Sequence, residues 1–269
     1  MVAEEKRADV AGAGVEVRSA LDREREIVLA RGRFATLFAG YREQAAGQGP
    51  LPGEVGLEVM RQAQAAAGLQ LALLPPDQFT AWTINLAEPP LNVFLAGDNK
   101  EFQLTGRVYS RDVATAERNR LFVETQRPRH QPSRSLLDFD GRDMLSAFEQ
   151  YHRRSVQSAT RLFEVAAGDF LIVQGLPRVD RDWLAGLDAA AAAAIEQAAG
   201  ETIETRRYCW RCGCNSHKML AVMRSMFGRQ PGELFGDQPE VEIRCPRCGR
   251  RWLVARQEFE AYDAQLGFT

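Results

Sequence analysis

The sequence predicts an α+β protein with a large N-terminal domain that contains a mixed α/β sheet, a helical linker and a small cysteine-rich C-terminal domain. The chain has 269 residues, and at ~150 residues per domain this length suggests about two domains. Segments with helical periodicity and segments with alternating periodicity are mixed along its first two thirds, as in α+β domains. All five cysteines lie between Cys209 and Cys248, so the C-terminal part differs in kind from the rest.

The helices and strands of the N-terminal domain follow from these periodicities. Residues 1–14 are polar and are predicted to form a frayed terminus. Apolar residues at helical spacings predict three helices, at 15–47, 57–73 and 143–157, the last starting near Asp143. Alternating or β-rich runs predict strands, which are 79–86, 91–96, 102–109, 121–125, 161–165 and 170–174. Pro177 closes this domain, which therefore spans residues 1–177.

Residues 178–205 are predicted to form a helical linker. Asp180 or Asp182 can cap the helix, and Gly200 can end it. Its apolar stripe is narrow and consists of Trp183, Leu187, Ala191 and Ile195. Because alanine buries little apolar area, at ~25 cal/mol per Å² this helix gains little free energy from docking. The linker is therefore expected to be metastable, and residues 206–269 form the C-terminal domain.

The composition and the N-terminus indicate the compartment. Hydrophobic residues make up 45% of the chain and charged residues 26%, with a net charge of −2, as is usual for globular proteins. The opening MVAEEKRADV predicts no secretory signal, and no uncharged apolar run approaches the ~20 residues of a membrane helix. We therefore expect a cytoplasmic protein without a membrane partner. In a reducing compartment, cysteines are metal ligands or redox sensors rather than structural disulfides.

The cysteines form two knuckles, CWRCGC at 209–214 and CPRCG at 245–249, which thirty residues separate. Two such knuckles joined by a connecting module are typical of tetrahedral Zn²⁺ sites, in which thiolates lie about 2.3 Å from the ion. Five cysteines for four positions leave two arrangements open. A CxxC…CxxC ribbon uses Cys209, Cys212, Cys245 and Cys248, whereas a CxC…CxxC site uses Cys212, Cys214, Cys245 and Cys248. His217 is a weaker candidate and is expected to be an exposed residue in a polar turn.

A site closed by four protein sulfurs is structural or redox-active rather than hydrolytic. Oxidation of the sulfurs destroys the ligands and expels the metal, and a small domain folded by its metal then loses its main stabilisation. Residues 206–251 hold ten Lys or Arg against four Asp or Glu. This positive charge favours reactive thiolates, but a solvated basic face or a nucleic-acid contact would have the same composition.

Around these cysteines the sequence resembles the redox-regulated 33-kDa heat-shock chaperones, also called disulfide-bond chaperones. The family's zinc centre combines CxC with CxxC at a similar separation, and the flanking segments 240–243, 252–254 and 258–260 also look alike. The segment 151–157 resembles a helical motif of the family, with Val156 in place of a glutamate. The segment 171–177 resembles a family strand that ends in Gln-x-Leu-Pro. The resemblance covers about 143–262.

The resemblance implies a zinc-bound, quiescent reduced state with Cys212, Cys214, Cys245 and Cys248 as ligands. It implies that oxidation forms the neighbouring disulfides Cys212–Cys214 and Cys245–Cys248, releases zinc and unfolds the linker. The activated protein, a homodimer in this family, then holds unfolded client proteins without ATP. Cys209 departs from the family pattern and is an extra thiol that can replace a ligand or resolve a sulfenate.

Two alternatives remain from the residues. The first is a zinc-ribbon nucleic-acid binder, favoured by the basic residues and aromatics near the knuckles and disfavoured by the net charge of −2. The second is a relative that kept the scaffold without the chaperone activity, because residues 1–140 match only in general α+β character. An enzyme is not expected, since the sequence contains no GxSxG, Walker loop or HExxH motif.

Overall fold

The computed structural model describes residues 14–111, 113–199, 201–228 and 230–265. They belong to two compact units, one ending at Arg211 and the other beginning at Cys212. The prediction for residues 1–14 lies, apart from Gly14, outside the described residues. None of the described helices has the length and apolar character needed to cross a membrane.

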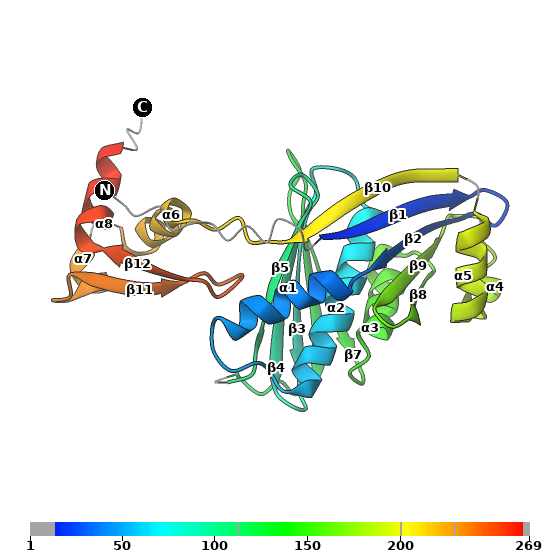
Figure 1. The fold of residues 1–269 in the computed structure, drawn as a ribbon, viewed down its shortest axis with the longest axis horizontal. Helices are drawn as coiled ribbons and strands as arrows, with labels where there is room; N and C mark the ends of the chain where they lie inside the picture. Colours follow the sequence, from blue (N-terminus) through cyan, green and yellow to red (C-terminus); the bar gives the residue numbers. More distant parts are fainter. Residues whose placement is uncertain (1–13, 112, 200, 229, 266–269) are drawn as a thin grey trace. The chain divides into compact units, whose positions relative to one another are not determined.

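The first unit is built on a sheet whose ten described strands follow the order β7-β6-β3-β4-β5-β10-β1-β2-β9-β8 (Figure 1). Every neighbouring pair is antiparallel except β10 with β5. The strands are β1 (Gly14–Asp22), β2 (Ile27–Arg33), β3 (Phe79–Leu86), β4 (Leu91–Asp98), β5 (Gln103–Tyr109), β6 (Asn119–Gln126), β7 (Ser133–Phe139), β8 (Thr160–Ala166), β9 (Asp169–Gly175) and β10 (Glu201–Trp210).

Strand β10 lies in the middle of this sheet although it is the last strand of the unit in the sequence. It pairs with β1 along most of its length, and it pairs with β5 only at Cys209 and Trp210. It therefore connects the strands from β7 to β5 with the strands from β1 to β8. The side chain of Trp210 is buried, and its Nε1 donates a hydrogen bond of 3.0 Å to Oε1 of Gln44.

Helices α1 (Ala35–Ala46), α2 (Glu54–Ala72) and α3 (Met144–Tyr151) pack with the buried strand residues into the main core. Helix α2 is buried along most of its length because small residues let it approach its neighbours closely. A Cβ on Gly68 would lie only 2.5 Å from the ring of Phe34. Asp143 caps α3 by accepting hydrogen bonds from the backbone N–H groups of Leu145 and Ser146. The chain then continues as the π-helix η1 (His152–Val156).

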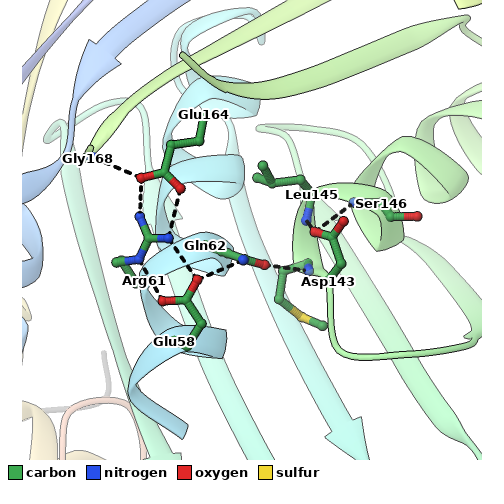
Figure 2. A network of polar contacts seen from close by, with 9 residues as sticks. Glu58, Arg61, Gln62, Asp143, Leu145, Ser146, Glu164 and Gly168 are labelled. Carbon is green, nitrogen blue, oxygen red and sulfur yellow. Dashed lines mark hydrogen bonds and ion pairs between the residues drawn. The ribbon is translucent and has the colours of Figure 1, made fainter. Parts of the chain in front are cut away.

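An ion-pair network fastens α2 to neighbouring elements, as Figure 2 shows. The guanidinium of Arg61 contacts Glu58 on its own helix at 2.7 Å and Glu164 of β8 at 2.6 Å. Glu164 also accepts a hydrogen bond from the backbone N–H of Gly168, which fixes the β8–β9 turn. Gln62, on the next position of α2, donates to Glu58 and accepts from the first backbone N–H of α3. The network thus sets the position of α2 against β8 and α3.

Two short helices, α4 (Arg181–Ala185) and α5 (Ala189–Ala198), precede β10 and cover a second apolar cluster. Leu184, Leu187 and Ala192 are buried in that cluster. Its sheet residues are Ile27, Leu29, Phe163, Leu171 and Val173. Asp180 caps α4 and Asp188 caps α5.

The second unit contains α6 (Ser216–Phe227), α7 (Pro231–Phe235), the hairpin β11 (Glu240–Arg244) and β12 (Arg251–Ala255), and α8 (Arg256–Gln265). Its core is small. One cluster of buried apolar side chains consists of Met223, Phe235, Val254 and Phe259, and Met219 packs beside the buried Cys245 and Cys248 in a second one. A core of this size gives little stability on its own, so a bound metal can decide whether such a unit folds.

The predicted α+β class is confirmed, and so are the helix at 57–73 and the strand at 79–86. The helix predicted at 15–47 is wrong over 15–33, which forms β1, β2 and the hairpin between them, and correct over 35–46, which forms α1. In residues 14–22, buried and less buried side chains alternate as they do in a strand. The apolar residues that follow lie at mixed spacings, which made the whole segment resemble a helix. Strand β7 was not predicted, since its polar residues mask the alternation.

The single helix predicted within 178–205 is also wrong. The chain forms two helices with separate caps, and residues from Glu201 onward belong to β10. The predicted apolar stripe is corrected too: Ala191 is exposed, whereas Leu184 and Ala192 are buried. Gly200, predicted to end the helix, lies outside the described residues.

Candidate metal centre

Two local structures present the cysteines of the second unit. Cys212 and Cys214 precede α6, whose N-cap Asn215 accepts a hydrogen bond of 2.8 Å from the backbone N–H of Lys218. Cys245 and Cys248 lie in the turn between β11 and β12. There the backbone N–H of Gly249 donates to the carbonyl of Cys245 at 2.8 Å. Gly249 has a φ of 76°, a left-handed conformation that glycine adopts without strain, and this closes the knuckle.

The sulfur atoms of Cys212, Cys214, Cys245 and Cys248 all lie within 4.8 Å of one another. The Sγ atoms of Cys214 and Cys248 lie 3.6 Å apart, and those of Cys212 and Cys245 lie 3.9 Å apart. Each contact joins one knuckle to the other. Tetrahedral thiolates about 2.3 Å from a common ion lie roughly 3.8 Å apart. The four sulfurs can therefore hold one metal ion with little movement.

The two knuckles differ in how deeply their cysteines are buried. The side chains of Cys245 and Cys248 are 1% and 2% exposed, whereas Cys212 and Cys214 are half-buried. Met219, Ile243 and Trp252 pack around the four sulfurs. The two outer sulfurs are therefore the ones that a water-borne oxidant reaches first, and the two inner ones lie in an apolar shell.

The thiols influence one another strongly. A hydrogen bond from Cys214 lowers the pKa of Cys212 to about 7, and a hydrogen bond from Cys212 lowers the pKa of Cys245. The pKa values of Cys214 and Cys248 are raised, with the contact to Cys212 as the largest cause in both. The cluster thus loses its first protons readily and keeps its last ones, because four adjacent thiolates repel one another. A divalent cation removes this repulsion, which is why the donor set fits a metal.

Positive groups lie beside the cluster. Nζ of Lys218 donates a hydrogen bond of 2.8 Å to the carbonyl of Gly213, between the two outer cysteines. The guanidinium of Arg250 lies 5.8 Å from the centre of the Trp252 ring. The composition of residues 206–251 predicts excess positive charge here, but the contacts of Lys218 and Arg250 and the cap at Asn215 were not predicted. Asn is a favoured N-cap residue, so Asn215 is itself a sequence signal for the start of α6, although Lys three residues later gives no capping box.

Cys209 and His217 are not members of the four-sulfur group. Cys209 is part of β10, where its backbone N–H donates to the carbonyl of Phe102 at 3.0 Å. Nε2 of His217 lies 3.4 Å from the hydroxyl of Tyr262. The four sulfurs that lie together are those of the CxC…CxxC set.

Comparison with known proteins identifies the fold. No protein-family model matches the sequence, and no curated protein sequence is significantly similar to it. Among solved structures, the chain is similar to the 33 kDa chaperonin (heat shock protein 33 homolog) of Thermotoga maritima, with a TM-score of 0.71 at 14% sequence identity. The match covers 93% of this chain and 97% of that one. The chain therefore has a heat-shock-protein-33-like fold, as the resemblance in sequence predicted, and carries four cysteines that can bind a metal ion.

Proposed function

We propose that the protein is a redox-regulated, ATP-independent holdase chaperone that is inactive while Cys212, Cys214, Cys245 and Cys248 bind Zn²⁺. The observation that supports this most directly is the four-sulfur group within a heat-shock-protein-33-like fold. Zn²⁺ is the metal of choice because soft thiolates in a closed tetrahedral set suit it. When bound, it would neutralise the thiolates and join the two knuckles of a unit with a small core.

The proposed switch is the oxidation of neighbouring cysteines. One thiolate attacks a peroxide oxygen, the O–O bond breaks and hydroxide leaves, which gives a sulfenic acid. The second thiolate of the knuckle then attacks the sulfenic sulfur and displaces its oxygen as hydroxide, which takes up a proton to form water. Each knuckle so loses two electrons, the peroxide gains them, and a disulfide forms. The resulting pairs are Cys212–Cys214 and Cys245–Cys248. A disulfide sulfur no longer carries the charge that holds a divalent cation, so oxidation removes the ligands.

The proposed client surface lies under the linker. Helices α4 and α5 cover an apolar cluster that includes Leu29, Phe163 and Leu171. Their own apolar contribution is small, with Leu184, Leu187 and Ala192 as the buried side chains. When the linker unfolds, this sheet surface becomes available to the apolar segments of unfolded proteins. We place this activity in the cytoplasm, with a homodimer as the activated form and no membrane partner.

The test is light scattering from a thermally unfolding client protein in the presence of reduced or peroxide-treated protein. We expect suppression of aggregation only after oxidation. Suppression in both states would indicate a constitutive holdase with a structural metal. Suppression in neither state would favour a relative without chaperone activity or a zinc-ribbon nucleic-acid binder, which salt-dependent binding to RNA or DNA identifies.

A further inference from the structure

Helix α6 holds three of the six methionines of the chain, Met219, Met223 and Met226. The helix begins at Ser216, two residues after Cys214 of the metal centre. With 3.6 residues per turn, Met219 and Met223 lie about one turn apart on the buried face of the helix. They are 9% and 5% exposed, whereas Met226 is 72% exposed. The same helix therefore presents thioethers both to the interior of the second unit and to solvent.

The two buried methionines connect the metal centre with the apolar core of the unit. Met219 packs against Cys245 and Cys248, the two inner cysteines. Met223 belongs to the adjoining apolar cluster, which holds the hairpin, α7 and α8 together. A chemical change at these two side chains therefore acts on the metal centre and on the core at the same time.

Peroxide, the oxidant of the proposed switch, also oxidises thioethers. The sulfur attacks one peroxide oxygen, the O–O bond breaks and hydroxide leaves. The proton on the oxygen that is now bound to sulfur passes to this hydroxide, which gives a sulfoxide and water. The sulfur loses two electrons and the peroxide gains them. The reaction converts a flexible apolar side chain into a polar one.

A sulfoxide at Met219 or Met223 opposes refolding of the second unit. Burial of a polar group without a partner costs free energy, and the small core of this unit offers little to offset that cost. Because metal binding and folding of such a unit are coupled, the cost lowers the affinity for zinc. A thiol reductant returns disulfides to thiols, but a methionine sulfoxide needs its own reductase. The two kinds of oxidation therefore revert by different routes.

We propose that Met219 and Met223 are second oxidation sites, which determine when the metal centre can reassemble. The proposal rests on the oxidative release of the metal described above, because both side chains are shielded in the folded unit and become accessible when it unfolds. Their sulfoxides then keep the unit unfolded after the disulfides have been reduced. Met226 is oxidised without unfolding, and its sulfoxide leaves the fold intact because the side chain already lies in solvent.

The test takes the full chain, loaded with zinc, through peroxide treatment and then reduction with dithiothreitol. Mass spectrometry of proteolytic peptides measures the sulfoxide at each methionine, and competition with a chromogenic chelator measures the zinc affinity. Met60 and Met144, which are fully buried in the first unit, are the internal references and should stay reduced. We expect sulfoxide at Met219 and Met223 to appear as zinc is released. After reduction, the zinc affinity should stay about tenfold or more below that of untreated protein.

The double variant Met219→Leu/Met223→Leu keeps apolar side chains of similar volume that peroxide does not oxidise. It should regain its full zinc affinity after reduction. Met226→Leu is the matched control, the same substitution on the exposed side of the same helix, and should behave like the wild type. Treatment of the oxidised and reduced wild type with methionine sulfoxide reductases should also restore the affinity. This second measurement needs no substitution in the core.

Three outcomes would overturn the proposal. In the first, Met219 and Met223 stay unoxidised in protein that has released its zinc. In the second, both carry sulfoxide and the zinc affinity nevertheless recovers fully on reduction. In the third, the double variant recovers no better than Met226→Leu. No client protein enters these measurements, so a lack of holdase activity would not imitate any of the three.

Discussion

Glu196→Gln is the substitution that best tests how the linker is held. Glu196 lies on α5 and is only 5% exposed. One carboxylate oxygen contacts Arg18 of β1 at 2.6 Å, and the other contacts Arg31 of β2 at 2.9 Å. Arg31 is also bonded to Asp169 of β9 at 2.9 Å. The carboxylate of a single α5 residue therefore fastens the helix to the sheet. The amide keeps the shape of the side chain and removes its charge.

The expected cost follows from the exposure of each partner. The Arg31 side chain is 23% exposed, and a hydrogen bond to such a charged, mostly buried group is worth about 1.5–3 kcal/mol. The Arg18 side chain is 46% exposed, so that its contact adds less, about 0.5 kcal/mol. Asp169 still pairs with Arg31 in the variant, which limits the loss of free energy. We expect Glu196→Gln to lower the free energy of α5 opening by about 2 kcal/mol, or about thirtyfold in the opening equilibrium.

Hydrogen exchange of the α5 amides measures this opening directly. Glu201→Gln is the matched control, because Glu201 also pairs with an arginine, Arg23, but both side chains are more than half exposed. The control should leave exchange in α5 unchanged, whereas Glu196→Gln should speed it about thirtyfold while β9 stays protected. Equal exchange in the two variants would refute the idea that this ion pair holds the linker helix.

Three further predictions concern the metal centre and a buried histidine. Reduced protein should bind one Zn²⁺ per chain, as measured by metal analysis, and substantially less would contradict the proposed centre. Cys245→Ser should lose the metal and Cys209→Ser should keep it; equal loss in both would support the ribbon set. Burial lowers the pKa of His152 to about 4 from an ordinary 6.5, so between these values the unfolded state binds the proton that the folded state excludes. Stability should therefore fall by about 3 kcal/mol as pH drops from 6.5 to 4. In urea titrations, His152→Leu should show a correspondingly smaller loss over this range, and an equal loss would show that the histidine does not carry it.

The sequence predicted best where the signal is local. Strand β3 alternates strictly, and its predicted and observed limits agree. The two cysteine knuckles could be named because each is a short local motif with its own turn. Choosing between Cys209 and Cys214 needed the fold. Cys209 belongs to β10, whose pairing with the distant β1 and β5 no local pattern reveals.

The errors arose where tertiary contacts override local preference. In residues 14–33, apolar and charged residues mix at spacings that suit either a helix or a hairpin. The turn is closed by Asp22, which accepts from the backbone N–H of Arg25, and by Glu26 at a φ of 54°. Neither feature is distinctive in sequence. Likewise, the alanines of α5 predict a helix correctly but conceal that its main attachment is Glu196, a charged residue that hydropathy assigns to solvent.

The placement of β10 determines how far unfolding can spread in the proposed switch. Cys212 follows Trp210 by two residues, so loss of the metal would first free a segment attached to β10. That strand is firmly held. Arg206 donates to the carbonyls of Leu71 and Leu74 at the end of α2, and the hydroxyl of Tyr208 donates to Asn99 at 2.9 Å. Unfolding that travels along the chain would have to break these buried contacts and the β1 ladder.

The linker helices, in contrast, bury few large side chains: the carboxylate of Glu196 ties α5 to the sheet, and a hydrogen bond from Arg161 to the carbonyl of Ala185 ties α4 to it. We therefore expect α4 and α5 to detach while β10 stays paired with β1, so that the sheet remains intact beneath the exposed cluster. Hydrogen exchange after oxidation checks this order, since amides of 181–198 should lose protection and those of 206–210 should keep it. Loss of protection in both segments together would mean that β10 leaves the sheet as well. The client surface would then include the exposed edges of β1 and β5 and not only the cluster under the linker.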